Sequence, residues 1–130
     1  MKNTIFRLIE YVYYFSLIIL LVLYLFPGSI IGYFMYGNLG QQPNLIKNPI
    51  GTSINHLIIF SYITVLAILI RSKVKNFFTS YKVILFLSLS LEILHLVIPN
   101  RGFELYDLFA NFFGVIIILL ITNFIKWAKF

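Results

Sequence analysis

Four long apolar segments constrain this chain more than any other feature. They cover about residues 5–26, 54–70, 81–98 and 103–125, and each is close to the ~20 residues that a helix needs to cross the ~30 Å hydrocarbon core of a bilayer. Their continuous apolarity favours helices over the alternating pattern of a membrane β-barrel. With 61% hydrophobic and 11% charged residues, the chain cannot supply the charged shell of a soluble domain. We therefore predict an all-α polytopic membrane protein with four transmembrane helices, forming one domain over residues 1–130.

The basic residues predict an orientation for this domain. If both termini are cytoplasmic, the cytoplasmic side carries most of the Lys and Arg residues, as the positive-inside rule requires. The residues placed inside are Lys2, Arg7, Arg71, Lys73, Lys75, Lys82, Lys126 and Lys129, whereas Lys47 and Arg101 lie outside. We expect a multi-pass protein of the cell membrane. Because the positive charges flank apolar segments, we expect anionic lipid head groups, and not nucleic acid, as their partners.

The connection over residues 27–53 is long and rich in glycine and proline, and it lies outside in this topology. It contains an apolar piece, residues 30–36. Long connections in compact domains often form lids or re-entrant segments. The alternative is a flexible loop whose aromatic side chains rest at the membrane surface.

Polar residues gather in one stretch, residues 91–114, which suggests a site. Three of the four acidic residues of the chain fall there, together with a histidine, an arginine and two amides. A polar group in hydrocarbon is costly unless it has a partner or a function. The residues are Glu92, His95, Asn100, Arg101, Glu104, Asp107 and Asn111.

The predicted topology brings polar residues of three helices to one depth. His56 begins the second segment at the outer face, and the third segment ends there, with His95 about one turn and Glu92 about two turns below residue 98. Asp107 and Asn111 share one face in the first turns of the fourth segment. We therefore predict a polar pocket in the outer leaflet. Ala110 and Gly114 form a small-xxx-small pair that permits close helix packing.

Three interpretations of this cluster remain open. In the first, Arg101 binds a phosphate or pyrophosphate, Asn111 donates further hydrogen bonds, and Glu92 or His95 acts as general acid or base. In the second, His56, Glu92, His95 and Asp107 bind a metal, but the E-x-x-H spacing occurs once, whereas bundle metal sites carry it twice with additional glutamates. We therefore predict no metal and no cofactor. In the third, Arg101 pairs with Glu104 and Asp107, and His95 pairs with Glu92, only to fix the helices.

The residues from Glu92 to Gly114 resemble the signature of the VanZ-like membrane proteins. That family typically has E-x-x-Q, then P-x-R, then D-hydrophobic-x-x-N-x-x-G across its last two helices, and a histidine followed four residues later by an aromatic. The matching positions here are Glu92, Pro99, Arg101, Asp107, Asn111 and Gly114, with His56 and Phe60 upstream. His95 stands where the family usually has glutamine, Phe60 replaces tyrosine, and Thr52-Ser53 replaces an acidic–basic pair.

This resemblance implies a small bacterial cell-membrane protein whose functional candidates are Glu92, Arg101, Asp107 and Asn111, followed by His56. The family's named member confers low-level resistance to teicoplanin. We expect binding or modification of an anionic envelope lipid or lipid-linked cell-wall precursor, with an influence on teicoplanin susceptibility. Whether the protein is an enzyme stays open. The candidate catalytic residues are Glu92, His95 and Asp107, and the candidate ligand-binding residues are Arg101, Asn111, His56 and Glu104. The alternatives are an accessory membrane subunit, with an exposed small-residue face at Ala110 and Gly114, and a membrane-embedded metal-dependent hydrolase.

Overall fold

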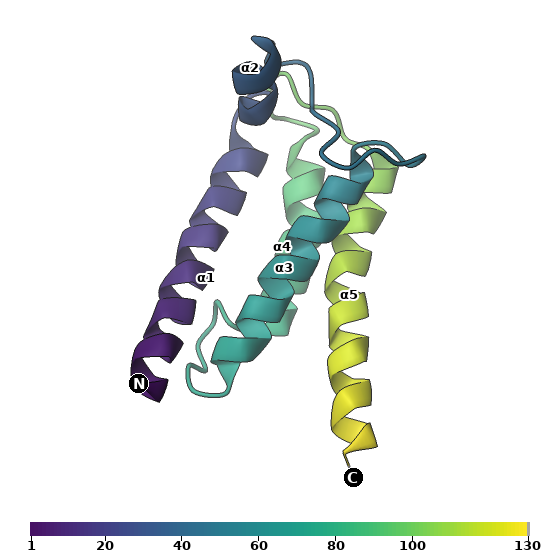
Figure 1. Cartoon of the computed structure of the whole chain (residues 1–130). Helices are drawn as coiled ribbons and strands as arrows, with labels where there is room; N and C mark the ends of the chain where they lie inside the picture. The colour runs from purple at the N-terminus through teal and green to yellow at the C-terminus, as the bar shows by residue number, and fades with distance from the viewer. Residues whose placement is uncertain (130) are drawn as a thin grey trace.

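A computed structural model describes residues 1–129, and within them every regular element is a helix (Figure 1). The five helices are α1 (Lys2–Leu25), α2 (Ile30–Tyr36), α3 (Ser53–Arg71), α4 (Tyr81–Leu94) and α5 (Leu105–Ala128). The two termini lie at the same end of the bundle, and α2 lies at the other end (Figure 1). The all-α prediction is confirmed.

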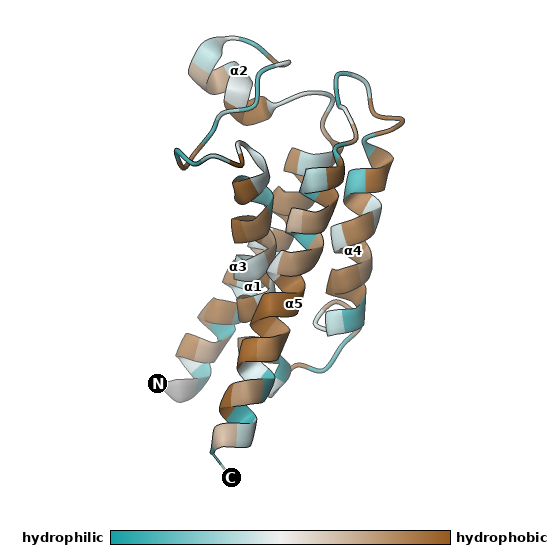
Figure 2. Ribbon diagram, turned by 90° about the vertical axis from the view of Figure 1, so that its right-hand side faces the viewer, coloured by the Kyte–Doolittle hydropathy of each residue, from teal (hydrophilic) through white to brown (hydrophobic). Residues whose placement is uncertain are grey.

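Three of the helices, α1, α3 and α5, are long and apolar enough to cross a membrane. Apolar residues run along their length, and hydrophilic residues concentrate in the connections and at the helix ends (Figure 2). Many large apolar side chains on their outer faces are exposed, for example Phe15 at 66% and Leu120 at 63%. Such faces suit a lipid environment and would aggregate in water.

The third predicted segment differs from the structure at its end. The sequence predicts a helix to residue 98, but α4 ends at Leu94, and His95 is its C-cap. The chain then tightens into i→i+3 hydrogen bonds, such as Leu96 N–H to the Ile93 carbonyl at 3.1 Å. Asn100, directly after Pro99, has a φ of 58°, a left-handed conformation that turns the chain sharply toward α5. With 14 residues, α4 is about 21 Å long as a helix, short of a full span.

Helix α3 lies between α1 and α5 and also contacts α4 (Figure 1). Its buried residues include Phe60, Ile63 and Ala67, which join core residues of every other long helix. Helix α5 approaches α3 closely at Gly114, where an added Cβ would lie 2.6 Å from the Leu57 carbonyl oxygen. The predicted small-residue contact therefore exists, and α3 covers it.

The connection over residues 26–52 folds across one end of the bundle and contains α2, which the sequence analysis treated only as an apolar piece. Ser29 caps α2 through its hydroxyl, which accepts from Gly32 N–H at 2.9 Å. A Cβ at Gly32 would lie 1.6 Å from the Gln41 carbonyl oxygen, so only glycine allows this approach. Asn55 then donates to the Pro43 carbonyl at 2.9 Å, which holds the connection to the start of α3.

Candidate functional site

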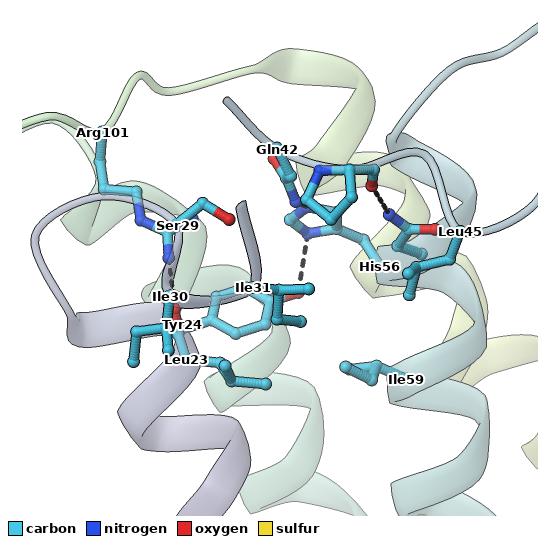
Figure 3. A pocket seen from close by; sticks show the side chains of 12 residues that line it. Leu23, Tyr24, Ser29, Ile30, Ile31, Gln42, Leu45, His56, Ile59 and Arg101 are labelled. Atoms are coloured by element: carbon cyan, nitrogen blue, oxygen red, sulfur yellow. Dashed lines mark hydrogen bonds between the residues drawn. The ribbon is translucent and has the colours of Figure 1, made fainter. Parts of the chain in front are cut away.

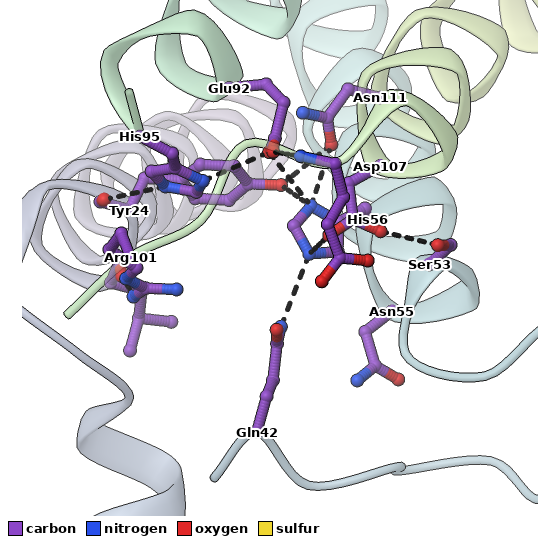
Figure 4. Close-up of polar contacts among 12 residues, drawn as sticks. Tyr24, Gln42, Ser53, Asn55, His56, Glu92, His95, Arg101, Asp107 and Asn111 are labelled. Atoms are coloured by element: carbon purple, nitrogen blue, oxygen red, sulfur yellow. Dashed lines mark hydrogen bonds and ion pairs between the residues drawn. The ribbon is translucent and has the colours of Figure 1, made fainter. Parts of the chain in front are cut away.

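The predicted polar residues converge at the end of the bundle where α1 and α4 finish and α3 and α5 begin, which we call the polar end (Figure 4). Five of them are buried, with exposed fractions of 5% or less. They are His56 from α3, Glu92 from α4, His95 at the C-cap of α4, and Asp107 and Asn111 from α5. The topological argument from the sequence therefore placed these side chains together correctly.

Tyr24, in the last turn of α1, lies at the centre of this cluster and was missed by the sequence analysis. Its hydroxyl donates to Asn111 Oδ1 at 2.7 Å and lies 2.7 Å from His56 Nδ1. Its ring stacks on His95, with 5.6 Å between the ring centroids. The chain has nine tyrosines, most of them in apolar runs, so no sequence signal distinguishes this one.

These contacts fix the tautomer of His56. The single hydroxyl proton of Tyr24 goes to Asn111 Oδ1, so Tyr24 can only accept from His56, and the donor is Nδ1–H. The same Nδ1 lies 3.2 Å from Asn111 Oδ1, a second acceptor. Gln42, from the covering connection, places its amide nitrogen 3.3 Å from His56 Nε2 (Figure 4). The Gln42 amide therefore faces Nε2, the second ring nitrogen.

Asp107 faces that nitrogen. Its Oδ2 lies 3.3 Å from His56 Nε2, and its Oδ1 accepts from the Ser53 hydroxyl at 2.5 Å. Ser53 is the first residue of α3 and Asp107 lies in the first turn of α5, so this bond ties two helix starts together. Ser53 was noted in the sequence only as a departure from the VanZ-like pattern.

Glu92 is fully buried, and its two carboxylate oxygens make different contacts. Oε1 accepts from the backbone N–H of Glu104 at 3.1 Å. Oε2 lies 3.2 Å from His95 Nδ1 and 3.9 Å from His56 Nδ1, but it has no hydrogen-bond partner among the described residues. His95 Nε2 in turn lies 3.0 Å from the Tyr24 carbonyl oxygen. The predicted pairing of Glu92 with His95 is thus present as a short charge contact.

Arg101 does not pair with acidic residues, although one interpretation of the sequence expected this. Its Nε donates to the Phe26 carbonyl at 3.2 Å, and its Nη2 donates to the Leu23 carbonyl. These are carbonyls at the C-terminal end of α1, where a helix leaves acceptors free and favours positive charge. Burial lowers the pKa of the guanidinium from its ordinary value, but nearby Tyr24 and Glu92 oppose this shift. Arg101 therefore holds the end of α1 with two N–H groups, and the other N–H groups of its guanidinium remain available.

Glu104, the N-cap of α5, is exposed and makes no ion pair within residues 1–129. Partial burial raises the pKa of its carboxyl, and the negative charges of Asp107 and Glu92 raise it further. His56 acts in the opposite direction. The polar end therefore concentrates three carboxyl groups in a small volume.

Two cavities open beside the cluster. A polar cavity of about 260 Å³ is bordered by side chains that include His56, His95, Asn100, Glu104 and Asp107. A smaller cavity of about 60 Å³ lies against apolar side chains of α1, α2 and α3, including Leu23, Ile30, Ile31 and Ile59 (Figure 3). Four residues line both of them: Ser29, Gln42, His56 and Arg101. We call the smaller cavity the apolar slot. It lies next to the polar cavity, and these four residues form the wall between the two.

One group of side chains in the described part of the chain has the composition of a metal site. His56, Glu92 and Asp107 each offer one ligand atom, and these three atoms lie within 4.8 Å of one another. His95, which the sequence analysis included among the ligand candidates, is outside this group.

Comparisons with protein-family models, curated proteins and solved structures found no match to this chain.

Proposed function

We propose that the protein is a multi-pass cell-membrane protein that binds an anionic envelope lipid, or a lipid-linked cell-wall precursor, at the polar end. The head group would occupy the polar cavity, and the first part of the apolar chain would occupy the slot. The observation that carries this proposal is the shared wall: Ser29, Gln42, His56 and Arg101 border both cavities. A polar chamber joined to an apolar slot matches the two halves of an amphiphile.

The proposed topology has four membrane passages and cytoplasmic termini, which puts the polar end in the outer leaflet. It is supported by the positive-inside count and by the position of the termini, which share one end of the bundle (Figure 1). In this topology α4 and the turns to residue 98 make the third passage. The chain has no cysteine, so single-cysteine variants can test the arrangement. Asn48→Cys should react with a membrane-impermeant maleimide on intact cells, and Lys75→Cys should react only after lysis; the reverse pattern would refute the topology.

Arg101 is the proposed anion contact. Two of its N–H groups donate to carbonyls of α1. A guanidinium has five N–H groups in total. The remaining donors line the cavity, at a fixed position, because the end of α1 holds the side chain. Such a pre-positioned fork suits the planar recognition of a phosphate.

The accessory-subunit alternative loses its expected signature. It required an exposed small-residue face, but Ala110 is 9% exposed and Gly114 packs against Leu57 and Phe60 of α3.

The resemblance to VanZ-like proteins stays a prediction and adds one consequence to the proposal. Expression of the chain in a sensitive host should change susceptibility to teicoplanin, and Arg101→Ala should remove this effect.

Native mass spectrometry of the gently extracted full-length protein tests lipid binding directly. Wild type should retain a phosphate-bearing lipid, and Arg101→Ala should lose it. Tyr13→Phe is the matched control, because it removes a side-chain hydrogen bond to a backbone carbonyl, that of Phe78, at the opposite end and changes no charge. Equal lipid occupancy in wild type and Arg101→Ala would overturn the proposed head-group site.

A second pair of variants tests the apolar slot without altering any charge. Ile59→Trp should fill the slot, since Ile59 lines it, and should reduce lipid retention. Ile58→Trp adds the same bulk on an exposed position and should have no effect. Unchanged retention in Ile59→Trp would show that the slot does not hold the lipid chain.

A further inference from the structure

Two polar atoms from different helices face each other at the polar end. His56 uses its Nδ1–H for the Tyr24 hydroxyl and Asn111 Oδ1, and its Nε2 faces the Gln42 amide and Asp107. Asp107 Oδ2 lies 3.3 Å from this nitrogen, and no hydrogen bond joins these two described residues. A positive centre shared by these two atoms would stabilise both of them.

The separation fits a metal ion better than a proton. Zinc–ligand distances of about 2.0–2.1 Å put two ligand atoms of a tetrahedral site about 3.4 Å apart. A charge-assisted N–H···O bond would instead bring the same atoms to about 2.7–2.9 Å. The observed 3.3 Å between His56 and Asp107 is close to that metal-site separation, and the Glu92 atom completes a group within 4.8 Å.

Both atoms are also oriented as metal ligands are. A metal-bound histidine normally donates its other ring N–H to a neighbouring acceptor, and a bound carboxylate is hydrogen-bonded through its second oxygen. Here Tyr24 and Asn111 receive the Nδ1–H of His56, and Ser53 holds Asp107 Oδ1 at 2.5 Å. These three outer contacts leave Nε2 and Oδ2 facing each other.

Glu92 supplies the third ligand. It is fully buried, and its Oε2 has no hydrogen-bond partner among the described residues, which is costly for a carboxylate in a bundle interior. One atom each of His56, Glu92 and Asp107 lies within 4.8 Å of the others. Arg101 hydrogen-bonds carbonyls of α1, and within residues 1–129 it makes no ion pair with either buried carboxylate.

We propose that His56, Glu92 and Asp107 form a binding site for one divalent transition-metal ion, with Zn²⁺ or Mn²⁺ as the chemical class. One imidazole and two carboxylates suit these ions, and a ligand set of three leaves a coordination position open toward the polar cavity. The site goes beyond the proposed lipid site and does not depend on it. The sequence analysis listed these three residues together with His95 as possible ligands, and the structure leaves His95 outside the group.

The test is metal binding by tag-free, full-length protein that has first been stripped with a chelator. Wild type should take up one Zn²⁺ per chain, measured by elemental mass spectrometry after desalting, and Co²⁺ should give the visible absorption of a low-symmetry site. His56→Ala and Asp107→Asn should lose stoichiometric metal. Asp107→Asn keeps the size of the side chain and an acceptor for Ser53, so it answers the question even if His56→Ala does not fold.

Thr64→Val is the matched control, because Thr64 is a buried polar residue of α3 like His56, but its hydroxyl donates to the Phe60 carbonyl within the helix and it lies outside the ligand set. It should bind one metal ion as wild type does. A wild-type protein that binds no Zn²⁺ or Mn²⁺, or an Asp107→Asn variant that binds as tightly as wild type, would overturn the proposal. Arg101→Ala separates the two sites: it should keep the metal and lose the lipid, so failure of one proposal is visible without failure of the other.

Discussion

Tyr24→Phe tests whether the inner hydrogen bonds of the polar end serve the site or only the fold. The change removes one hydroxyl, which donates to Asn111 Oδ1 and accepts from His56 Nδ1, each at 2.7 Å. A neutral hydrogen bond contributes about 0.5–1.5 kcal/mol, so two give about 1–3 kcal/mol of lost stability. Since the hydroxyl also fixes the tautomer of His56, we expect metal affinity to fall about 10–100-fold, as for other outer-shell contacts of a metal site.

Tyr13→Phe is the matched control for this change. Tyr13 is another fully buried tyrosine of α1, and its hydroxyl donates to the Phe78 carbonyl at 2.5 Å, away from the polar end. Losing this single bond should cost about 0.5–1.5 kcal/mol of stability. It should leave metal affinity unchanged, because none of the proposed ligands or their partners contacts Tyr13.

The assay pairs two measurements on the same samples. Competition with a coloured chelator gives Zn²⁺ affinity, and thermal unfolding of the chelated protein gives stability. A 10–100-fold loss corresponds to about 1.4–2.7 kcal/mol, which both methods resolve. If Tyr24→Phe bound Zn²⁺ as tightly as wild type, His56 would not need this partner to present Nε2, and the tautomer argument would fail. If both variants lost affinity equally, the loss would reflect stability alone.

Two further changes test the cover and the charge of the polar end. Gly32→Ala should loosen the connection that carries Gln42, because its Cβ would lie 1.6 Å from the Gln41 carbonyl oxygen; we expect faster limited proteolysis of residues 37–52, whereas Gly102→Ala, with open space around its Cβ, should leave the rate unchanged. Glu104→Gln should raise the melting temperature at neutral pH, because burial and neighbouring carboxylates raise the pKa of this carboxyl, so its ionised form destabilises the fold. That gain should shrink as the pH falls through the raised pKa and the wild-type carboxyl becomes neutral; a gain that is constant with pH would refute the charge explanation.

The sequence predicted the helices and the convergence of polar groups because both follow from one-dimensional patterns. Apolar length locates α1, α3 and α5, and charge counting sets which helix ends lie together. Helical spacing then places Asp107 and Asn111 on one face. These rules need no knowledge of packing, so they identified His56, Glu92 and Asp107 as neighbours from three separate segments.

The contacts that give the site its chemistry depend on groups that the sequence does not distinguish. The partners of Arg101 are backbone carbonyls of α1, which every residue possesses, so the expected pairing with Glu104 and Asp107 was wrong. Tyr24 is one tyrosine among nine, and Gln42 reaches His56 only because Gly32 lets the connection fold closely. Such contacts follow from tertiary packing.

The same packing links the proposed metal to the proposed lipid. An anion entering the polar cavity meets Asp107 and Glu104 on its wall, and Arg101 is the only arginine or lysine that lines it among the described residues. The two carboxylates would repel a phosphate more strongly than the single guanidinium would attract it. A divalent ion on His56, Glu92 and Asp107 reverses this balance, because it neutralises the buried carboxylates and leaves Arg101 free to act on the head group. Lipid retention should therefore fall when the metal is removed, although metal binding does not require the lipid.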